Sequence, residues 1–516
     1  MKKRITQLVL CIALIIALVL TTACSTSSGS KSAEGDKSST TTAPKTTKEP
    51  ITITIFGVPT TVPETDPIIP ELEARLGIDI IIESTGGDES LLVSRLAGGD
   101  IPDVFRVTTV SNLSSYYRDG VLLNLKDYMD EMPNVRDMFT EQQWARVTFD
   151  GGIYGIPRRP EENYNCWYIR NDWLKKLNKE DPSTFDELME VAIAMNEADL
   201  DGNGKNDTYA ISGTYGRAVS TFGRGAFEGF WTAYGVTNPE TIMIKDNKAV
   251  LAVTLPEFRL ATEEINRFVK AGVVDPEIPA NNGDTLLEKM ATGKAGICYG
   301  AWCNYSKIEQ IERLTSVFPD AEWVPKRNQI TTSYGVSGAT KSASGNDAVY
   351  AINADLVDQP EKLDAILNMF NYFASDECDL LLSFGIEGMH YKIDSNGTIV
   401  KLDKMNELTY GWGIQFLGRP DMLYCMTKFD NCAEYIKYCA TEIPIYYHYG
   451  QLVKQPEGIN VPDIESYILE QVSQFIYGTR SMDEWDKFID TLYKAYSIQT
   501  YVDAANETLT ELGYIK

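Results

Sequence analysis

Short strands and amphipathic helices alternate along the chain after residue 50, and this alternation limits the fold more than any other feature of the sequence. ITITIFGV at 51–58 is rich in β-branched residues and alternates in polarity, as a strand does. PIIPELEARLG at 67–77 has the apolar spacing of a helix and ends in glycine, and IDIIIES at 78–84 is again a strand. The order strand–helix–strand predicts a βαβ unit and an α/β fold.

The same pattern continues to about residue 300. DESLLVSRLAGGDIPDVFRVT at 88–108 predicts a helix that ends at two glycines, followed by a strand from Asp103. Thr184 and Glu187 have the spacing of a capping box at the start of TFDELMEVAIAMNEA. We also expect helices at 171–177 and 256–272 and a strand at 295–300, AGICYG. With 516 residues the chain has room for roughly two to four domains.

The first 50 residues predict export from the cytoplasm. Lys2, Lys3 and Arg4 precede an apolar run from Leu8 to Leu20, which is shorter than the roughly 20 residues of a membrane-spanning helix. LTTAC at 20–24 resembles a bacterial lipobox, although Leu20 lies one position earlier than that pattern prefers. The resemblance implies a signal peptide at 1–23 and acylation (palmitate) of Cys24. Residues 24–50 are almost free of apolar side chains and predict a disordered tether; an ordinary cleaved signal peptide is the alternative.

Charge and cysteine content exclude some classes of partner. The chain has 47 Lys and Arg against 73 Asp and Glu, a net charge of -26, so phosphate backbones are repelled and nucleic acid is not expected as a partner.

Of the 9 cysteines, the seven outside the export segment are an odd number, so complete disulfide pairing is impossible. Cys425, Cys432 and Cys439 recur at helical spacing, too far apart for one zinc ion, and are expected as buried thiols. Whether Cys298 and Cys303 form a bridge stays open.

DLDGNGKND at 199–207 has the ligand spacing of an EF-hand loop. Asp199, Asp201, Asn203, the Lys205 carbonyl and Asp207 fall at positions 1, 3, 5, 7 and 9, and Gly204 falls at the turn. Position 12 is Ala210 in place of a bidentate glutamate, and TYAIS after it predicts a strand and not a second helix. The loop therefore predicts either a structural calcium site that joins a helix to a strand or a turn without metal.

Seven segments in the same order resemble the extracellular solute-binding proteins of carbohydrate ABC importers (family 1, LplA-like lipoproteins). They are LAGGDIPDVF (96–105), GGIYGIPRRP (151–160), YIRNDWLKKL (168–177), DGNGKNDTYAISG (201–213), ATGKAGICYGAW (291–302), QPEKLDAILNMFNYFASDE (359–377) and FGIEGMHYKIDSNG (384–397).

The resemblance implies a two-lobe periplasmic-binding-protein-like clamp of type II, with mixed sheets flanked by helices and a hinge between the lobes. Residues 51–160 plus 335–405 would form lobe 1, and residues 161–334 plus 406–516 would form lobe 2. The chain would pass from one lobe to the other near 158–165, near 334–339 and near residue 405. Related binding proteins carry a calcium site, often completed by an acidic residue beside position 9, where Thr208 and Tyr209 offer none.

Aromatic and arginine side chains are the candidate ligand contacts. Sugar rings stack on aromatic side chains, and the resemblance places a sugar-stacking tryptophan at Trp302, after the strand at 295–300. Trp231 and Trp412 stand in glycine-flanked segments; a buried packing role is the alternative for any tryptophan, and it is expected for Trp173 and Trp485. Tyr164, Asn165 and Tyr334 lie on the expected crossings. Arg158, Arg159, Arg217 and Arg224 could bind an acidic oligosaccharide, or they could form salt bridges or lie on the surface.

No catalytic motif appears. The two histidines, His390 and His448, form no metal pair, and nucleophile-elbow, phosphate-loop and dinucleotide-binding patterns are absent from the sequence. We therefore expect a binding protein and not an enzyme: a monomeric, lipid-anchored substrate-binding component that captures an oligosaccharide at the extracellular face of the membrane for its permease subunits. A secreted glycosidase or lyase is the alternative, because so many acidic residues always include candidate pairs.

Overall fold

The computed structural model describes residues 49–516, except 163, 206, 216–224, 302, 346–347 and 455. Residues 50–516 form one compact unit by their contacts. The signal peptide, Cys24 and nearly all of the predicted tether therefore lie outside the described residues. Within those residues, no helix is both long enough and apolar enough to span a membrane.

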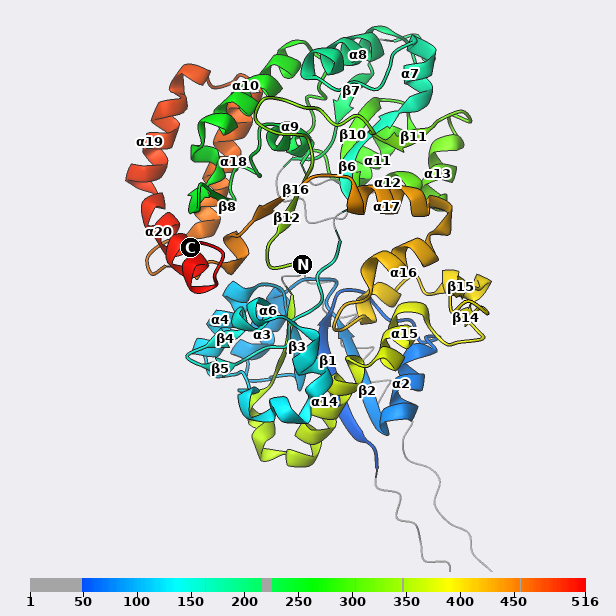
Figure 1. Ribbon diagram of the computed structural model, residues 1–516, viewed down its shortest axis with the longest axis vertical. Coiled ribbons are helices and arrows are strands. Elements are labelled where there is room, and N and C mark those ends of the chain that lie inside the picture. Colours follow the sequence, from blue (N-terminus) through cyan, green and yellow to red (C-terminus); the bar gives the residue numbers. More distant parts are fainter. Residues whose placement is uncertain are drawn as a thin grey trace, which may run out of the picture. The chain divides into compact units, whose positions relative to one another are not determined.

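The first sheet contains four strands in the order β13-β3-β1-β2. Strands β1, β2 and β3 are parallel, and β13 pairs with β3 in the antiparallel direction. The strands and their neighbouring helices are β1 (Ile51–Val58), α2 (Ile68–Leu76), β2 (Ile78–Ser84), α3 (Ser90–Ala97), β3 (Val104–Val107), α4 (Val110–Arg118), α5 (Pro133–Met138), α6 (Glu141–Ala145), β13 (Val349–Ile352), α14 (Pro360–Phe373) and α15 (Asp376–Phe384). Figure 1 shows α2 and α14 beside β1 and β2. The predicted βαβ unit at 51–84 is confirmed.

The second sheet also contains four strands, in the order β11-β6-β10-β7. Strand β10 runs parallel to β7 and antiparallel to β6, which makes this sheet mixed as well. The elements around it are β6 (Asn165–Arg170), α7 (Asn171–Leu177), α8 (Phe185–Glu197), β7 (Tyr209–Ser212), α9 (Glu228–Ala233), α10 (Pro256–Lys270), α11 (Gly283–Ala291), β10 (Ala295–Ala301), α12 (Cys303–Ser306), α13 (Ile308–Thr315) and β11 (Trp323–Pro325). The capping box of Thr184 and Glu187 forms at the start of α8.

The C-terminal part is mostly helical. Helices α18 and α10 contact each other beside the second sheet, and β16 pairs with β12 in the parallel direction. The remaining elements are β8 (Ile242–Lys245), β9 (Lys248–Leu251), β12 (Ala339–Ser342), β14 (Tyr391–Ile393), β15 (Ile399–Lys401), α16 (Asp421–Lys428), α17 (Ala433–Thr441), β16 (Ile445–His448), α18 (Val461–Ile476), α19 (Trp485–Ala495) and α20 (Ile498–Glu511), with the short hairpin β4 (Thr148–Phe149) and β5 (Gly152–Ile153) earlier in the chain.

Each sheet has an apolar core on both faces, because successive strand residues point to opposite sides. On the first sheet, Val104 packs with the core that includes α14, and Phe105 packs with the core that includes α3 and α4. On the second sheet, Trp167 packs with α8, α9, α10 and α18, and Tyr168 packs with α11 and α17. The mixed α/β architecture with helices on both sides of each sheet agrees with the predicted fold class.

The third crossing is a segment that passes between the two cores twice. Met405 and Tyr424 belong to the core around the second sheet, whereas Leu408, Tyr410, Phe416 and Leu417 belong to the core of the first. The chain therefore passes between the cores near residue 405 and again at about residues 418–421, and we call residues 405–421 the third crossing.

The cysteines with described side chains are all buried: Cys166, Cys298, Cys378, Cys425, Cys432 and Cys439. This confirms that Cys425, Cys432 and Cys439 are buried thiols, but they do not share one helix. Helix α16 ends at Lys428, and α17 begins at Ala433, so the seven-residue spacing spans a break in the helix. The Cys303 side chain lies outside the described part of the chain.

A buried carboxylate ties three elements together beside the second sheet. Glu228 on α9 is fully buried and accepts hydrogen bonds from the Tyr299 hydroxyl of β10 at 2.8 Å and from the Thr340 backbone N–H of β12 at 2.6 Å. The Thr340 hydroxyl donates to the same oxygen at 3.0 Å. These bonds fix β12, in the stretch of chain that leads from the second sheet back to the first.

Candidate ligand-binding site

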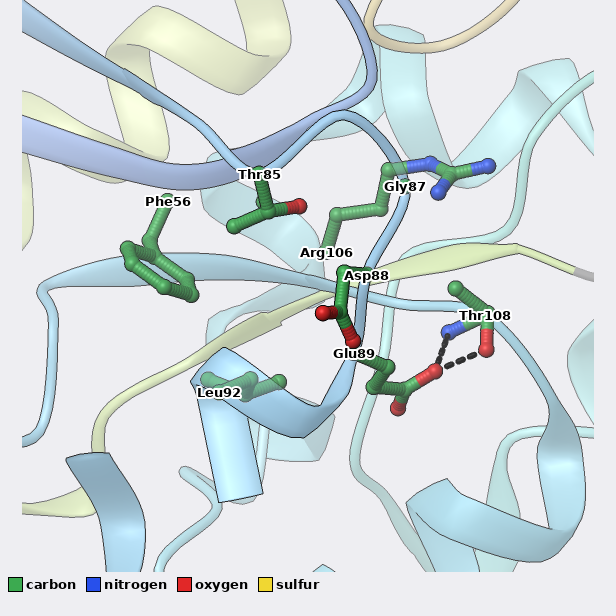
Figure 2. A pocket seen from close by; sticks show the side chains of 9 residues that line it. Phe56, Thr85, Gly87, Asp88, Glu89, Leu92, Arg106 and Thr108 are labelled. Carbon is green, nitrogen blue, oxygen red and sulfur yellow. Dashed lines mark hydrogen bonds between the residues drawn. The ribbon is translucent and has the colours of Figure 1, made fainter. Parts of the chain in front are cut away.

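The carboxyl ends of β1, β2 and β3 meet at one edge of the first sheet, because the three strands are parallel. In open α/β sheets this is the edge at which ligands bind. A small cavity of about 10 Å³ lies there, lined by Phe56, Gly57, Thr85, Gly87, Asp88, Glu89, Leu92, Arg106 and Thr108 (Figure 2). Its volume suits a single water molecule, so the loops around it, and not the cavity itself, are the candidate surface for a ligand.

A bulge at the end of β1 shapes this edge. The register with β2 shifts between Phe56 and Val58, and Gly57 has a φ of +88°, which favours glycine. A Cβ atom at Gly57 would lie 3.2 Å from the carbonyl oxygen of Arg106. Glycine at this position therefore lets β1 and β3 approach closely at the point where Arg106 leaves the sheet.

Glu89 is held at this edge by hydrogen bonds. Its carboxylate accepts from the Thr108 backbone N–H at 3.1 Å and from the Thr108 hydroxyl (Figure 2), and the Tyr116 hydroxyl donates at 3.2 Å. Burial raises the pKa of Glu89, and hydrogen bonds from Asn112, Thr108 and Tyr116 together with the charge of Arg106 partly offset that effect. The bonds join the start of α3 to the end of β3, so Glu89 fixes the loop after β2.

Arg106 is the unexpected member of the site. It lies on β3 directly opposite Tyr350 of β13. Figure 2 shows its side chain extending away from Glu89, and among the described residues its guanidinium has no hydrogen bond or ion pair. Its Nε atom is buried, so a donor is left without an acceptor there. The sequence carried one signal for this residue, a single charge inside the apolar strand VFRV.

Arg158 lies next to the same strand. The segment before it is joined to β13 by two backbone hydrogen bonds between Ile156 and Tyr350, at 2.7 and 3.0 Å. Its guanidinium is buried and donates to the carbonyl oxygens of Phe416 at 2.8 Å and Gln415 at 3.0 Å. Burial lowers the pKa of Arg158; the neighbouring Tyr350 and Glu161 oppose this decrease, and the charges of Arg106 and Arg419 add to it.

Arg159 forms an ion pair. Its guanidinium lies 2.6 Å from the Asp379 carboxylate of α15, and its backbone N–H donates to the Leu417 carbonyl at 2.9 Å. The Glu162 backbone N–H donates to the Asp421 carboxylate at 2.8 Å. The first and third crossings therefore run side by side. For Arg159 the structure shows the salt bridge that was the alternative to ligand binding.

Several predicted contacts lie outside the described residues, namely Trp302, Arg217 and Arg224. The residue before Trp302, Ala301, is paired with Asn165 at the edge of the second sheet. Asn165 thus lies at the strand end where the tryptophan was expected. Tyr164, the residue before it, is half-buried, and burial raises its pKa, with Cys425 and Asp421 as neighbours.

The aromatic candidates differ in exposure. Trp231 is only 3% exposed and stacks on Phe258 with ring centroids 5.6 Å apart, so its ring is not accessible to a ligand in this structure. Its flanking glycines suggested a loop, but the segment forms the buried helix α9. Trp412 and Tyr334 are 47% and 50% exposed. Tyr334 stacks on Tyr234 at 5.6 Å. Among the aromatic candidates that the structure describes, Trp412 and Tyr334 therefore have the more accessible rings.

The loop at 199–207 has the expected wrapped shape. Asp199 accepts the backbone N–H groups of Asn203 and Gly204, both at 2.9 Å, and Gly202 and Gly204 have φ angles of +72° and +74°. The Asn203 side-chain amide donates to Asp201 at 2.6 Å and to Asp207 at 2.9 Å. The loop joins α8 to β7, as predicted.

The side chains of this loop are partly arranged to hold a cation. Two carboxylates converge on one Asn203 nitrogen, and rotating that amide would present its oxygen to the same point. The Asp201 pKa is raised, chiefly by burial, whereas hydrogen bonds from Asn203 and Lys294 lower the pKa of Asp207. Lys294 pairs with Asp207 at 2.9 Å, and Ala210 at position 12 is buried in β7. In the described ranges no group of three or more His, Cys, Asp or Glu residues is placed to hold a metal. The donor types suit calcium, and the ligand set is incomplete.

The family model described as bacterial extracellular solute-binding protein matches residues 59–361. The polygalacturonan/rhamnogalacturonan-binding protein YtcQ of Bacillus subtilis (strain 168) is 26% identical over 346 residues, 66% of this chain and 66% of YtcQ. The fructooligosaccharide ABC transporter substrate-binding protein FusA of Streptococcus pneumoniae serotype 4 is 26% identical over 225 residues, 40% of each chain. Less than two thirds of either relative is therefore matched.

Among solved structures, the alginate-binding protein AlgQ2, crystallised without calcium ion, superposes with a TM-score of 0.69 and 19% identity. The match covers 90% of this chain and 98% of AlgQ2. At this identity the likeness concerns the fold, which is the two-lobe fold of solute-binding proteins. Because the matching family consists of binding proteins, the glycosidase or lyase alternative is withdrawn.

Proposed function

Because the chain belongs to the family of bacterial extracellular solute-binding proteins, we propose that it captures an oligosaccharide and delivers it to the permease subunits of an ABC importer. The match across residues 59–361 carries this proposal. The saccharide ligands named for YtcQ and FusA support the class of ligand. The accessible rings of Trp412 and Tyr334 agree with it, since sugar faces stack on aromatic rings.

The proposed mechanism is closure of two lobes on the ligand. Lobe 1 consists of residues 51–160 plus 335–405, and lobe 2 of residues 161–334 plus 406–516. We move residues 406–417 to lobe 1, because Leu408 and Phe416 pack in the core of the first sheet. A ligand closes such a clamp only if it binds the closed state more tightly than the open one. The crossings near 158–165, near 334–339 and near residue 405, with the further passage at 418–421, would form the hinge.

In this proposal the ligand lies between the carboxyl edge of the first sheet and the strand ends of the second. Trp302 would stack on a sugar ring, with Asn165 beside it as a hydrogen-bonding partner. Arg217 and Arg224 are kept as candidate contacts. Trp231 is removed, because its ring is buried in the core. Arg159 is kept as a residue that holds the crossing and not as a ligand contact, because Asp379 occupies its guanidinium.

We also propose that the protein is a monomer held at the extracellular face of the membrane by an acylated Cys24, with residues 24–50 as the tether. The basic start, the short apolar run and the cysteine at its end support the anchor. Labelling with a radioactive or clickable palmitate and a Cys24→Ala control tests it. Label on the wild type and none on the variant is the expected result, and label on both would contradict it.

Calcium is proposed as a structural cofactor of the loop at 199–207. Asp199, Asp201, Asn203, Asp207 and the Lys205 carbonyl would hold it. A bound cation would neutralise carboxylates that the loop brings together. The convergence of Asp201 and Asp207 on Asn203 supports this proposal. Lys294 already neutralises part of the charge of Asp207, so we expect weak affinity.

Isothermal titration against neutral and acidic oligosaccharides, with an assay for new reducing ends, tests the function. Saturable binding of an oligosaccharide without cleavage is the expected result. Cleavage of the sugar by the pure protein, or no binding across a broad panel, would overturn the proposal.

A further inference from the structure

Two arginines at the edge of the first sheet form no salt bridge among the described residues, although Glu89 lies near Arg106 and Glu161 near Arg158. Arg106 makes neither a hydrogen bond nor an ion pair there, and its Nε atom is buried. Arg158 is buried and donates only to backbone carbonyl oxygens. By contrast, Arg95, on the other face of the same sheet, pairs with Glu83 at 2.7 Å and with Asp100 at 2.9 Å.

The two guanidinium groups lie around one residue, Tyr350. Arg106 is opposite Tyr350 in the β3–β13 register, and Ile156, two residues before Arg158, is hydrogen-bonded to Tyr350 from the other side. Residues paired across a sheet, and residues two apart in an extended segment, point to the same face. Arg106 and Arg158 are therefore two positive charges on the same side of neighbouring extended segments.

Glu89 is close enough to Arg106 for the arginine charge to lower its pKa, but it makes no ion pair with that arginine. Asp88 accepts the Ser90 backbone N–H at 2.9 Å, and Glu89 accepts hydrogen bonds from Thr108 and Tyr116. Figure 2 shows the Arg106 side chain extending away from the Glu89 carboxylate. In a chain with a net charge of -26, two neighbouring arginines that form no salt bridge among the described residues stand out.

Such an arrangement is unfavourable without an anion. A partly buried cation loses hydration, and nearby like charges repel each other. A guanidinium group has a planar fork of donors that matches the two oxygens of a carboxylate. A sugar carboxylate at this edge would supply the missing acceptor and the missing charge together.

We propose that the ligand is an acidic oligosaccharide whose carboxylate binds the Arg106 guanidinium, with Arg158 behind it as a second positive charge. Arg106 is the specificity-determining contact, and Arg158 is a positioning residue because it holds the crossing through Gln415 and Phe416. The inference rests on the proposed capture of an oligosaccharide and adds the charge of its ligand.

Matched pairs of probes test the charge directly. Short oligomers of galacturonate, glucuronate and mannuronate are each titrated beside their methyl esters, which keep the ring and remove the charge. We expect one free acid to bind about tenfold to a hundredfold more tightly than its ester, because a charge-assisted hydrogen bond is lost in the ester. High sodium chloride should reduce this preference. Neutral and sulfated oligosaccharides complete the panel.

Variants assign the preference to a residue. Arg106→Met should bind acid and ester equally, and Arg106→Lys should keep part of the preference, because it retains the charge but not the fork. Arg95→Met is the matched control: it removes the same charge from α3, on the other face of the sheet, and should keep the wild-type preference. Melting curves check that each variant is folded. If Arg106→Met does not fold, a reduced preference for the acid in Arg106→Lys tests the role of Arg106 instead.

The outcomes separate the two proposals. If the wild type binds acid and ester equally, or binds a sulfated or neutral sugar more tightly, the proposal of a carboxylate on the ligand is wrong. The proposal that the protein captures an oligosaccharide is not affected by that result. A preference that survives in Arg106→Met overturns the role of Arg106. Failure to bind any oligosaccharide overturns the proposed function itself.

Discussion

Lys428, the last residue of α16, offers a quantitative test of the packing around the third crossing. Its side chain is 8% exposed, and its ammonium group donates to the Leu408 carbonyl at 2.6 Å and to the Tyr424 hydroxyl at 3.0 Å. Within the described chain it has no carboxylate partner. Burial lowers the pKa of Lys428 from 10.5 to about 8, and the charges of Arg419 and Lys307 contribute to the same decrease.

This decrease makes the stability depend on pH. Between pH 8 and 10.5 the unfolded chain holds the Lys428 proton and the folded chain does not, so the free energy of unfolding rises with pH in this window. Each pH unit is worth about 1.36 kcal/mol, which gives about 3.4 kcal/mol in total for Lys428. This contribution is fully present above pH 10.5 and is lost as the pH falls to about 8. The magnitude is an upper value, since water that enters the site would restore part of the hydration.

The assay is urea unfolding of the wild type and Lys428→Met across that window. Methionine keeps an unbranched side chain and removes the titrating group, and the two lost hydrogen bonds add an offset that does not change with pH. We expect the wild type to gain about 3 kcal/mol relative to the variant between pH 8 and 10.5. Lys454→Met, which removes an exposed lysine paired with Glu511 at 2.8 Å, is the control and should follow the wild type. If the free energy of unfolding changes with pH in the same way for the wild type and Lys428→Met, the reasoning is refuted.

Three further predictions concern the ligand, the cation and the buried carboxylate. Trp302→Ala should weaken oligosaccharide binding by about 1–3 kcal/mol without changing the melting temperature, and unchanged affinity in titration would remove Trp302 from the site. Chelation by EDTA should lower the melting temperature and leave the sugar stoichiometry unaltered; identical melting curves would argue against the calcium site. Glu228→Ala should cost about 2–5 kcal/mol in urea unfolding, because the Thr340 N–H loses its acceptor and the Tyr299 hydroxyl keeps only the Gly338 carbonyl at 3.2 Å. Glu228→Gln should cost less, and equal losses would contradict the hydrogen-bond explanation.

The secondary structure was predictable where local chemistry decides it. The strand at 51–58 and the helix that ends before Gly77 follow from side-chain spacing and from a glycine with positive φ, and both form as expected. The capping box of Thr184 and Glu187 depends on residues three apart. Such signals do not require knowledge of the rest of the fold.

Burial and partner choice were less predictable, because they depend on distant segments. Trp231 looked like a loop residue beside glycines, but the ring of Phe258 covers it in the core. The spacing of Cys425, Cys432 and Cys439 suggested one helix, and the chain instead turns between α16 and α17. Local periodicity does not reveal which other element covers a side chain.

The candidate site was predictable only in part. The sequence identified Arg158 as a candidate, but it gave no reason to prefer Arg158 over Arg159. The structure separates them: Asp379 forms a salt bridge with Arg159, whereas among the described residues the Arg158 guanidinium is hydrogen-bonded to backbone carbonyl oxygens. Arg106 was missed, because its significance comes from its register with Tyr350, which is distant in sequence.

The paired first and third crossings constrain how the molecule can deform. The bonds from the Arg159 N–H to Leu417 and from the Glu162 N–H to Asp421 link the two segments at separate points. Sliding one segment along the other would break both bonds, whereas bending the two together breaks neither. The softest deformation of this joint is therefore a rotation about a line across both segments, and shear is the stiff direction.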